Sequence, residues 1–541
     1  MKGHRPRSGL AGSGLALLAL AVATVSVMAQ RPAADLILSN GKVATVDEAF
    51  RFAQAVAVRG DRIVAVGSNQ EVEPWAGPAT RRIDLAGRTV VPGLIDNHLH
   101  LMRAGTNWPW EVRWDGVDRR RAALDLLRAK ATRTPAGEWI YILGGWTLDQ
   151  FADDARPFTR EELDRAVPDH PVLLQASYFK SYVNSRAAQV LGVEAPTGVV
   201  DESGIRALAA RLPVATGERL EAGTRQMLQY LNQAGLTSVG SAACEPDVMP
   251  VYRTLAASNQ LNVRVFCITG FAPGTPQQVD DVLPGIARMK LFGGDTLINT
   301  VAYGETVYGP LHDPMFVPTS RPQPDQLAQW RRVADAVASA GLTLHVHANL
   351  APTIGAFLDQ IEAVNQEHPI ERLRWTLAHV NQIQPSHLAR MKRMGMFAAV
   401  HPWAVINGGI NQDVFGAAAA DMAPLRMIQD SGVPWGLGSD GSRANQIRPF
   451  VTLGWAVTGK MVGGRVVLRQ PISRQDALVA HTRRNAFALF QETQLGSIEA
   501  GKLADLVVLD RDYFTVPADD IKDIAAVLTV AGGRVAYDGR K

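Results

Sequence analysis

His98 and His100 lie one residue apart, at the end of an apolar run that follows Pro92-Gly93. Alternate residues of a strand share a face, so a strand here would present both imidazoles to one side. Neutral imidazole is a common ligand for zinc and similar metals. Taken alone, the pair is as typical of two partly buried strand histidines, so the metal interpretation depends on the rest of the chain.

Other residues that could bind a metal or carry a proton stand in or at the end of further short apolar runs. They are Lys290 in Met289-Lys-Leu-Phe, His345 and His347 in Leu342-Thr-Leu-His-Val-His, His379 in Leu377-Ala-His-Val, and Asp440 in Gly438-Ser-Asp-Gly. Such groups are costly in apolar strands unless they are paired or bound to a metal. One of them would usually be a satisfied core residue, whereas this many indicate a metal site.

The runs that carry these residues alternate with helical patterns. Eight strands are predicted, over residues 94–100, 237–242, 263–268, 288–292, 342–347, 374–379, 396–400 and 433–440. Helices that end at a glycine and lead into a strand are typical of parallel β/α units. The sequence therefore predicts an α/β protein with a (β/α)8 TIM barrel, in which catalytic groups gather at the carboxyl ends of the strands.

Short β patterns occupy both ends of the chain. Asn40-Gly41 and Gly60-Asp61 each separate two strand-like runs, which predicts hairpins. We expect residues 30–92 and 490–541 to form one β-sandwich domain and residues 93–489 to form the barrel, with two separate sheet units as the alternative. Residues from about 105 to 225 are too many for one crossover and predict an insertion after the first barrel strand.

The first residues are typical of a secretory signal. Lys2, Arg5 and Arg7 precede an apolar run, and small residues lead to Ala29. We expect a signal peptide over residues 1–29, cleaved after Ala29, and a secreted or periplasmic protein; an uncleaved anchor is the alternative. No other stretch is long enough to span a membrane.

The formal charge of the 541 residues is +3, and residues 1–29 hold those three charges and no acid. The remainder is neutral, which gives a nucleic-acid partner no support. Cys244 and Cys267 are the only cysteines, and both lie in apolar, strand-like segments. We expect buried free thiols, with a bridge between them left open and Cys244 as a metal ligand a remote alternative.

Several motifs together resemble the amidohydrolase superfamily of metal-dependent hydrolases, in the branch of N-substituted formamide deformylase. They are Pro92-Gly-Leu-Ile-Asp-Asn-His-Leu-His, Leu163-Asp to Pro171-Val, Asn184-Ser, Lys290-Leu-Phe, His347-Ala, Ala378-His379, Gly438-Ser-Asp440, and Gly496-Ser-Ile-Glu-Ala-Gly-Lys-Leu-Ala-Asp-Leu-Val-Val. The resemblance runs from about residue 33 to the end. It implies a barrel with a small β-sandwich made from both termini.

The resemblance also implies roles for six residues. His98 and His100 would bind the more buried metal, His347 and His379 the second, and a carboxylated Lys290 would bridge them. Asp440 would bind metal or its water and act as general base.

Two of these six residues have simpler interpretations. Lys290 could be an ordinary lysine paired with Asp295, and Asp440 a turn residue. His345 is expected to pack beside the ligands rather than bind metal.

The chain departs from the family pattern near the expected substrate. Phe179-Lys180 replaces a Gly-His pair, and Asn349-Leu350 replaces Gly-Asp. His401 and Lys180 are candidate substrate contacts, with a solvated loop histidine as the alternative for His401. Tyr178 and Trp146 are weaker candidates for the wall of the site, as is the pair Trp108 and Trp110.

These observations predict an exported hydrolase of a non-peptide carbon–nitrogen bond, of amide type, that acts on a small molecule. We expect a divalent metal, zinc first, in one or two ions per chain. The alternatives are a metal-dependent ester, lactone or phosphoester hydrolase, and a non-catalytic exported binding protein on the same fold. The oligomeric state is left open, with a homo-oligomer as one alternative.

Overall fold

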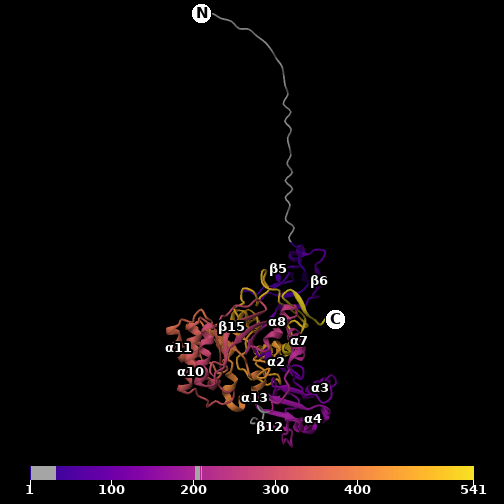
Figure 1. Ribbon diagram of the computed structural model, residues 1–541. Coiled ribbons are helices and arrows are strands. Elements are labelled where there is room, and N and C mark those ends of the chain that lie inside the picture. The colour runs from indigo at the N-terminus through magenta and orange to yellow at the C-terminus, as the bar shows by residue number, and fades with distance from the viewer. Residues whose placement is uncertain (2–31, 202–207, 209, 541) are drawn as a thin grey trace.

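The computed structural model describes residue 1, residues 32–201, residue 208 and residues 210–540 (Figure 1). The expected signal peptide, apart from Met1, lies outside the described residues. Within the described part, no helix combines the length and the apolar character needed to cross a bilayer.

Eight parallel strands form the barrel in the order β19-β18-β17-β16-β15-β14-β13-β8. Their bounds are β8 (Leu94–Leu99), β13 (Leu236–Ala242), β14 (Arg264–Thr269), β15 (Ile298–Glu305), β16 (Leu344–Ala348), β17 (Thr376–His379), β18 (Phe397–Val400) and β19 (Trp435–Leu437). The edge strands meet where Leu99 bridges to Gly441, which closes the sheet. The predicted (β/α)8 barrel is confirmed.

Amphipathic helices cover the barrel, as the sequence pattern predicts. The main ones are α7 (Gly217–Gln233), α8 (Met249–Ala257), α9 (Pro276–Arg288), α10 (Pro324–Ser339), α11 (Ala351–Glu367), α12 (Pro385–Arg393) and α14 (Leu425–Ser431). In α10, Trp330, Val333 and Val337 recur at helical spacing and are buried. Gly341 follows at φ +67°, which suits the turn into β16.

The predicted fourth strand is wrong. Residues 289 and 290 follow directly on α9 as irregular chain, and Lys290 is exposed. The strand lies instead at β15, where Val301, Ala302 and Tyr303 are buried. The short apolar run around Lys290 suggested a strand, but the longer run after it provides the side chains that fill the barrel.

Strands from both ends of the chain share one sheet, ordered β22-β21-β20-β7-β2-β3. Its members are β2 (Lys42–Ala44), β3 (Phe52–Ala53), β7 (Thr89–Pro92), β20 (Leu506–Leu509), β21 (Ala526–Ala531) and β22 (Arg534–Asp538). Val91 of β7 lies opposite Val507 of β20. Gly93 then joins β7 to the first barrel strand, and a Cβ there would lie 2.1 Å from Thr237 Oγ1, so only glycine fits.

The second terminal sheet has the order β5-β4-β1-β6. It comprises β1 (Leu36–Ser39), β4 (Ala55–Arg59), β5 (Arg62–Gly67) and β6 (Arg81–Asp84). The hairpin at Gly60-Asp61 is confirmed, because β4 and β5 pair antiparallel. The hairpin at Asn40-Gly41 is wrong: β1 pairs with β4 and β6, so this turn carries the chain from one sheet to the other.

The insertion has its own sheet, ordered β12-β11-β10-β9, with helices α3 (Arg120–Ala131), α4 (Arg160–Ala166) and α5 (Ser185–Leu191). The strands are β9 (Ile140–Leu143), β10 (Val172–Ala176), β11 (Lys180–Val183) and β12 (Val199–Asp201). A separate apolar core forms around Trp114, Trp146 and Phe158. Figure 1 shows α3 and α4 at the opposite end of the molecule from β5 and β6.

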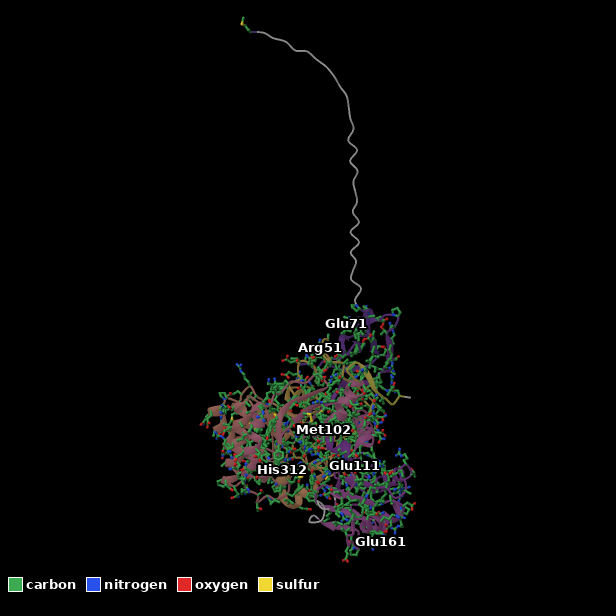
Figure 2. The ribbon with its side chains drawn as sticks, in the orientation of Figure 1. Arg51, Glu71, Met102, Glu111, Glu161 and His312 are labelled. Carbon is green, nitrogen blue, oxygen red and sulfur yellow. A yellow bond between two sulfur atoms is a disulfide. The ribbon has the colours of Figure 1, made fainter. Side chains whose placement is uncertain are left out.

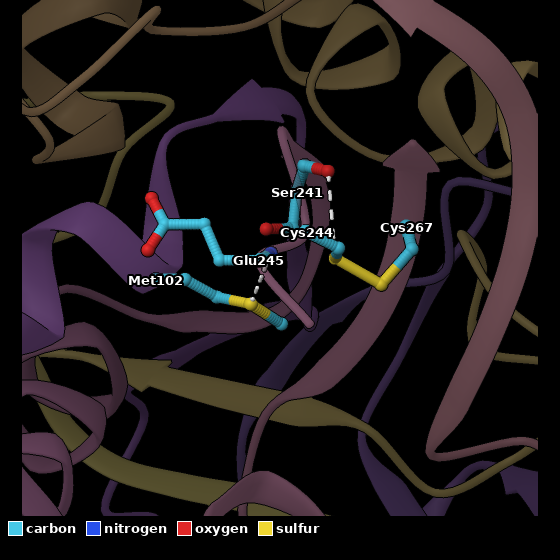
Figure 3. Close-up of a disulfide and its surroundings, with 5 residues drawn as sticks. All are labelled: Met102, Ser241, Cys244, Glu245 and Cys267. Atoms are coloured by element: carbon cyan, nitrogen blue, oxygen red, sulfur yellow. Dashed lines mark hydrogen bonds between the residues drawn. A yellow bond between two sulfur atoms is a disulfide. The ribbon is translucent and has the colours of Figure 1, made fainter. Parts of the chain in front are cut away.

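A disulfide joins Cys244 and Cys267, whose Cα atoms are 5.6 Å apart (Figure 3). The expectation of free thiols is therefore wrong, and the open alternative of a bridge is what the structure contains. β13 and β14 are neighbouring strands, and Ser241 lies opposite Cys267. The turn after β13 brings Cys244 back to that level, a relationship that sequence separation does not reveal.

Candidate metal centre

His98 and His100 lie at the carboxyl end of β8 with their Nε2 atoms directed at the same carboxylates. His98 is fully buried, and its Nδ1 shares a hydrogen bond with His345 Nε2 at 2.9 Å. Its Nε2 lies 3.5 Å from Glu305 Oε2 and 3.7 Å from Asp440 Oδ1. For His100 Nε2 the corresponding distances are 3.7 and 3.3 Å. His345 thus orients His98, as expected for a packing residue.

Glu305, the last residue of β15, stands between two pairs of histidines. Its Oε2 faces His98 and His100, while its Oε1 lies 3.2 Å from His347 Nδ1 and 3.1 Å from His379 Nε2. Burial opposes ionisation of this carboxyl, but the surrounding imidazoles hold its pKa well below its ordinary range. An ionised carboxylate with one oxygen toward each pair can bridge two cations.

The expectation that Lys290 bridges the metals is wrong. Lys290 is exposed and lies outside the barrel, and Glu305 occupies the tip of the fourth strand. A carboxylate already supplies two anionic oxygens, so no carboxylation is needed there. The sequence held a clue, since Glu305 follows the apolar stretch Val301–Tyr303 after a single glycine.

Asp440 completes the cluster from the loop after β19. Its Oδ2 lies 3.6 Å from His379 Nδ1, and its Oδ1 faces His98 and His100. Burial works against the charged form, but His379, His100 and His98 outweigh it and lower the pKa of Asp440 to about 2. Asp440 is therefore an ionised base at neutral pH, and the turn-residue alternative does not explain these contacts.

His347 is held by a residue that the sequence analysis missed. Its Nε2 lies 2.7 Å from Oδ1 of Asp313, a buried residue on the loop between β15 and α10. Asp313 Oδ2 in turn accepts hydrogen bonds from the backbone N–H groups of Asn349 and Leu350, at 3.0 and 2.8 Å. Asn349 and Leu350 are the two positions that depart from the family pattern. Here Asp313, from the loop after β15, contacts both of them and holds His347.

His401 lies against His379 in the interior of the protein. It is fully buried, its Nδ1 lies 2.8 Å from His379 Nδ1, and its Nε2 lies 2.8 Å from Asn97 Oδ1. His401 therefore fixes the ring of His379. The solvated-loop interpretation is wrong, whereas a contact between His401 and substrate stays a prediction.

Lys180 lies exposed at the start of β11. Among the described residues, its side chain forms no hydrogen bond or ion pair with the cluster. Two residues earlier, Tyr178 lies within electrostatic range of Asp440 and Glu305. Trp146, the other wall candidate in the insertion, is buried in the core of that unit.

The donor set fits a divalent metal. Two groups bring their ligand atoms within 4.8 Å of one another: His98, His100 and Asp440, and His98, Glu305 and His379. His98 Nε2 is buried and has no hydrogen-bond partner among the described residues, although it faces the centre of the cluster. Nitrogen and carboxylate ligands of this kind suit zinc and its neighbours.

In Figure 2 the region of Met102 and His312 lies between the terminal sheets, marked by Arg51 and Glu71, and the insertion, marked by Glu161.

Comparisons with known proteins agree with this architecture. The sequence profile described as the amidohydrolase family matches residues 81–537. An N-substituted formamide deformylase from Arthrobacter pascens is 26% identical and covers 93% of this chain and 98% of its own. An uncharacterised metal-dependent hydrolase from Pyrococcus furiosus superposes with a TM-score of 0.63 at 21% identity, covering 89% of this chain and all of that one. An adenosine deaminase from Xanthomonas campestris with bound zinc gives 0.53 at 16% identity, over 94% of each chain.

Proposed function

The chain belongs to the amidohydrolase family, and from this premise we propose that it hydrolyses an amide-type, non-peptide carbon–nitrogen bond of a small molecule. The family makes it a metal-dependent hydrolase; the bond type, the ligands and the location are the proposal. The observation that carries it is Glu305, whose two oxygens face two separate histidine pairs.

In this proposal His98, His100 and Asp440 would hold one divalent ion and His347 and His379 would hold a second, with the Glu305 carboxylate facing both pairs of histidines. Zinc is the first candidate, because the donors are imidazole and carboxylate and the Xanthomonas relative is described with bound zinc. When bound, such an ion lowers the pKa of a water ligand and polarises a carbonyl oxygen.

The residues of the chain supply the rest of the reaction. Asp440 is ionised at neutral pH, so it accepts the proton of the attacking water and returns it to the leaving nitrogen. His345 and His401 orient His98 and His379 through their ring nitrogens. Asp313 fixes His347 with Nδ1 toward Glu305.

Export to an oxidising compartment is part of the proposal. The disulfide between Cys244 and Cys267 supports it, because disulfides persist mainly in secreted and periplasmic proteins. The basic and apolar residues before Ala29 give the same indication.

The test combines metal analysis with matched substrates. Replacing His98 and His100 together by alanine should remove bound metal and hydrolysis while the chain stays folded, whereas His368→Ala, at the end of α11, should change neither. Undiminished hydrolysis by the double variant refutes the site. A screen of N-formyl and N-acyl amines against the corresponding esters decides the bond: turnover of esters alone refutes the amide assignment, and a protein without metal or turnover favours a binding protein.

A further inference from the structure

Two arginines beside the metal centre have no partner for their charge. Arg103 follows His100 by three residues in α2 (Leu101–Asn107), and Arg443 follows Asp440 by three. Nε and Nη2 of Arg103 and Nε of Arg443 are buried without a hydrogen bond to any described residue. Neither guanidinium forms an ion pair with any residue that the structure describes. Buried donors on a charged group are costly when they are unsatisfied, so this arrangement requires an explanation.

The barrel holds the two segments side by side. Leu99 bridges to Gly441, and the backbone N–H of His100 donates to Gly441 O at 2.7 Å. The insertion fixes Arg443 from the other side, since Gly145 N donates to its carbonyl at 2.7 Å. A Cβ on Gly144 would lie 2.3 Å from the same carbonyl, so the backbone packs closely there.

The charge of Arg103 acts on both Arg443 and His100, which indicates that the two guanidinium groups lie near the site and near each other. Burial, and then the charge of Arg103, lower the pKa of Arg443. The same two causes lower the pKa of His100. The charges of both arginines and of Asp440 also act on the hydroxyl of Tyr178. Desolvation raises the pKa of this hydroxyl.

Arg113, in the same region, has carboxylate partners for its guanidinium group. Arg113 Nη1 lies 2.9 Å from Glu111 Oε1, and Arg113 Nε lies 3.0 Å from Asp115 Oδ2. Glu111 is therefore engaged through Oε1, while its Oε2 is buried without a hydrogen bond to any described residue. The contrast shows that the region contains carboxylates and that they pair with Arg113 rather than with Arg103 or Arg443.

Glu245 is another acid close to the pair. It lies on the loop after β13, where its backbone N–H donates to Met102 Sδ at 3.0 Å (Figure 3). Its pKa is raised by burial, against the opposing charges of Arg103 and Arg443, and its carboxylate makes no hydrogen bond to either. With Glu245, Glu305 and Asp440 nearby, the arginine pair can accept a single negative charge more readily than a double one.

Aromatic rings also lie beside the cluster. The ring centroids of Phe179 and Phe316 are 4.7 Å apart, those of Phe316 and Trp403 5.9 Å, and those of Trp403 and His379 6.2 Å. The cluster thus has unpaired cations near His100 and aromatic rings near His379. Guanidinium groups bind carboxylates through paired, charge-assisted hydrogen bonds.

We propose that Arg103 and Arg443 bind a carboxylate of the substrate, so that the preferred substrates are N-acylated amines that bear a carboxylate next to an apolar group. This inference rests on the proposed function for its hydrolytic part. The binding part stands on the unsatisfied guanidinium donors alone.

The test compares N-formyl-phenylalanine with N-formyl-phenethylamine, which lacks only the carboxylate. The metal-loaded full chain should cleave the carboxylate substrate with the higher kcat/KM. Arg103→Met and Arg443→Met should each lower that kcat/KM roughly 10- to 1,000-fold, mainly through KM, and change the neutral substrate by less than about twofold. Arg469→Met, which removes an exposed partner of Asp421, is the matched control. An equal fall for both substrates, or no fall, overturns the inference.

Binding gives a second readout that does not need turnover. Calorimetry with 3-phenylpropanoate and 3-phenylpropanol should show tighter binding of the carboxylate, lost in the methionine variants and partly kept in Arg443→Lys. If neither formyl substrate is cleaved, the proposed function fails, and this measurement still decides the role of the arginines. Equal affinity for the acid and the alcohol refutes it, as does a matched phosphonate that binds more tightly than the carboxylate. A variant that does not match the wild type in circular dichroism is replaced by its lysine counterpart.

Discussion

Glu305 Oε1 lies 3.1 Å from His379 Nε2, across the barrel from the strand that carries the first two histidines. This contact, together with that of Oε2 to His98, makes Glu305 the residue on which the two halves of the cluster converge.

Glu305→Gln should lower the bound metal and reduce kcat by at least about 100-fold, because loss of even an outer-shell partner typically costs 10- to 100-fold. Elemental analysis after dialysis and a hydrolysis assay measure both effects. Lys290→Ala is the control, and it should leave both unchanged, since Lys290 is exposed outside the barrel. Loss of metal in Lys290→Ala with full retention in Glu305→Gln would reverse the assignment.

Asp313→Asn should weaken metal binding roughly 10- to 100-fold, because the carboxylate that orients His347 becomes a neutral amide. Competition with a chromogenic chelator measures the affinity without any substrate. Asp519→Asn, at an exposed pair with Lys460, is the control. Equal affinities in all three proteins would show that Asp313 has no such role.

The protein should lose stability in mild acid because His481 is buried in its neutral form. It is fully buried and its Nδ1 bonds to Ile95 O, and burial lowers its pKa to about 4 from the ordinary 6.5. The unfolded chain binds this proton first as the pH falls, so stability is fully present above pH 6.5 and declines toward pH 4. The largest contribution is about 3 kcal/mol.

Thermal unfolding of the metal-free protein at pH 7.5 and pH 5 measures this effect. His481→Gln should lose less of its midpoint temperature between the two pH values than the wild type loses. Identical shifts in the two proteins would exclude His481 as the source.

Cys244→Ala combined with Cys267→Ala should lower the free energy of unfolding by about 3 kcal/mol, from the entropy of a loop closed over a separation of 23 residues. Denaturant titration of the oxidised wild type, the reduced wild type and the double variant measures it. The reduced wild type should match the variant. An oxidised protein as labile as the variant would contradict the prediction.

The sequence predicted the barrel well where hydrophobic runs and functional residues coincide, as at His98 and His379. It failed at the fourth strand because two candidate runs lay within fifteen residues of each other, and the family motif favoured the one around Lys290. Only the burial of Val301 and Tyr303 shows which run fills the barrel. The local sequence pattern cannot decide which run becomes the strand, because the two runs are distinguished only by the residues that pack against them in the folded protein.

Contacts between loops were also beyond the reach of the sequence. Asp313 and His347 are 34 residues apart, and the ion pair between them forms only when the loop after β15 folds over β16. The sequence makes His401 a candidate substrate contact, with a solvated loop position as the alternative, yet the ring is buried and its Nδ1 lies 2.8 Å from His379 Nδ1. The turn at Asn40-Gly41 has the composition of a hairpin, but β1 is already paired on both edges.

The pairing of Val91 with Val507 has a consequence for the order of assembly. β7 leads through Gly93 straight into the strand with His98, and its neighbour β20 is among the last segments to be synthesised. A nascent chain that still lacks β20 leaves one edge of β7 open, directly beside the first ligand strand. The sheet that supports the first ligand strand is therefore completed only when translation is almost finished.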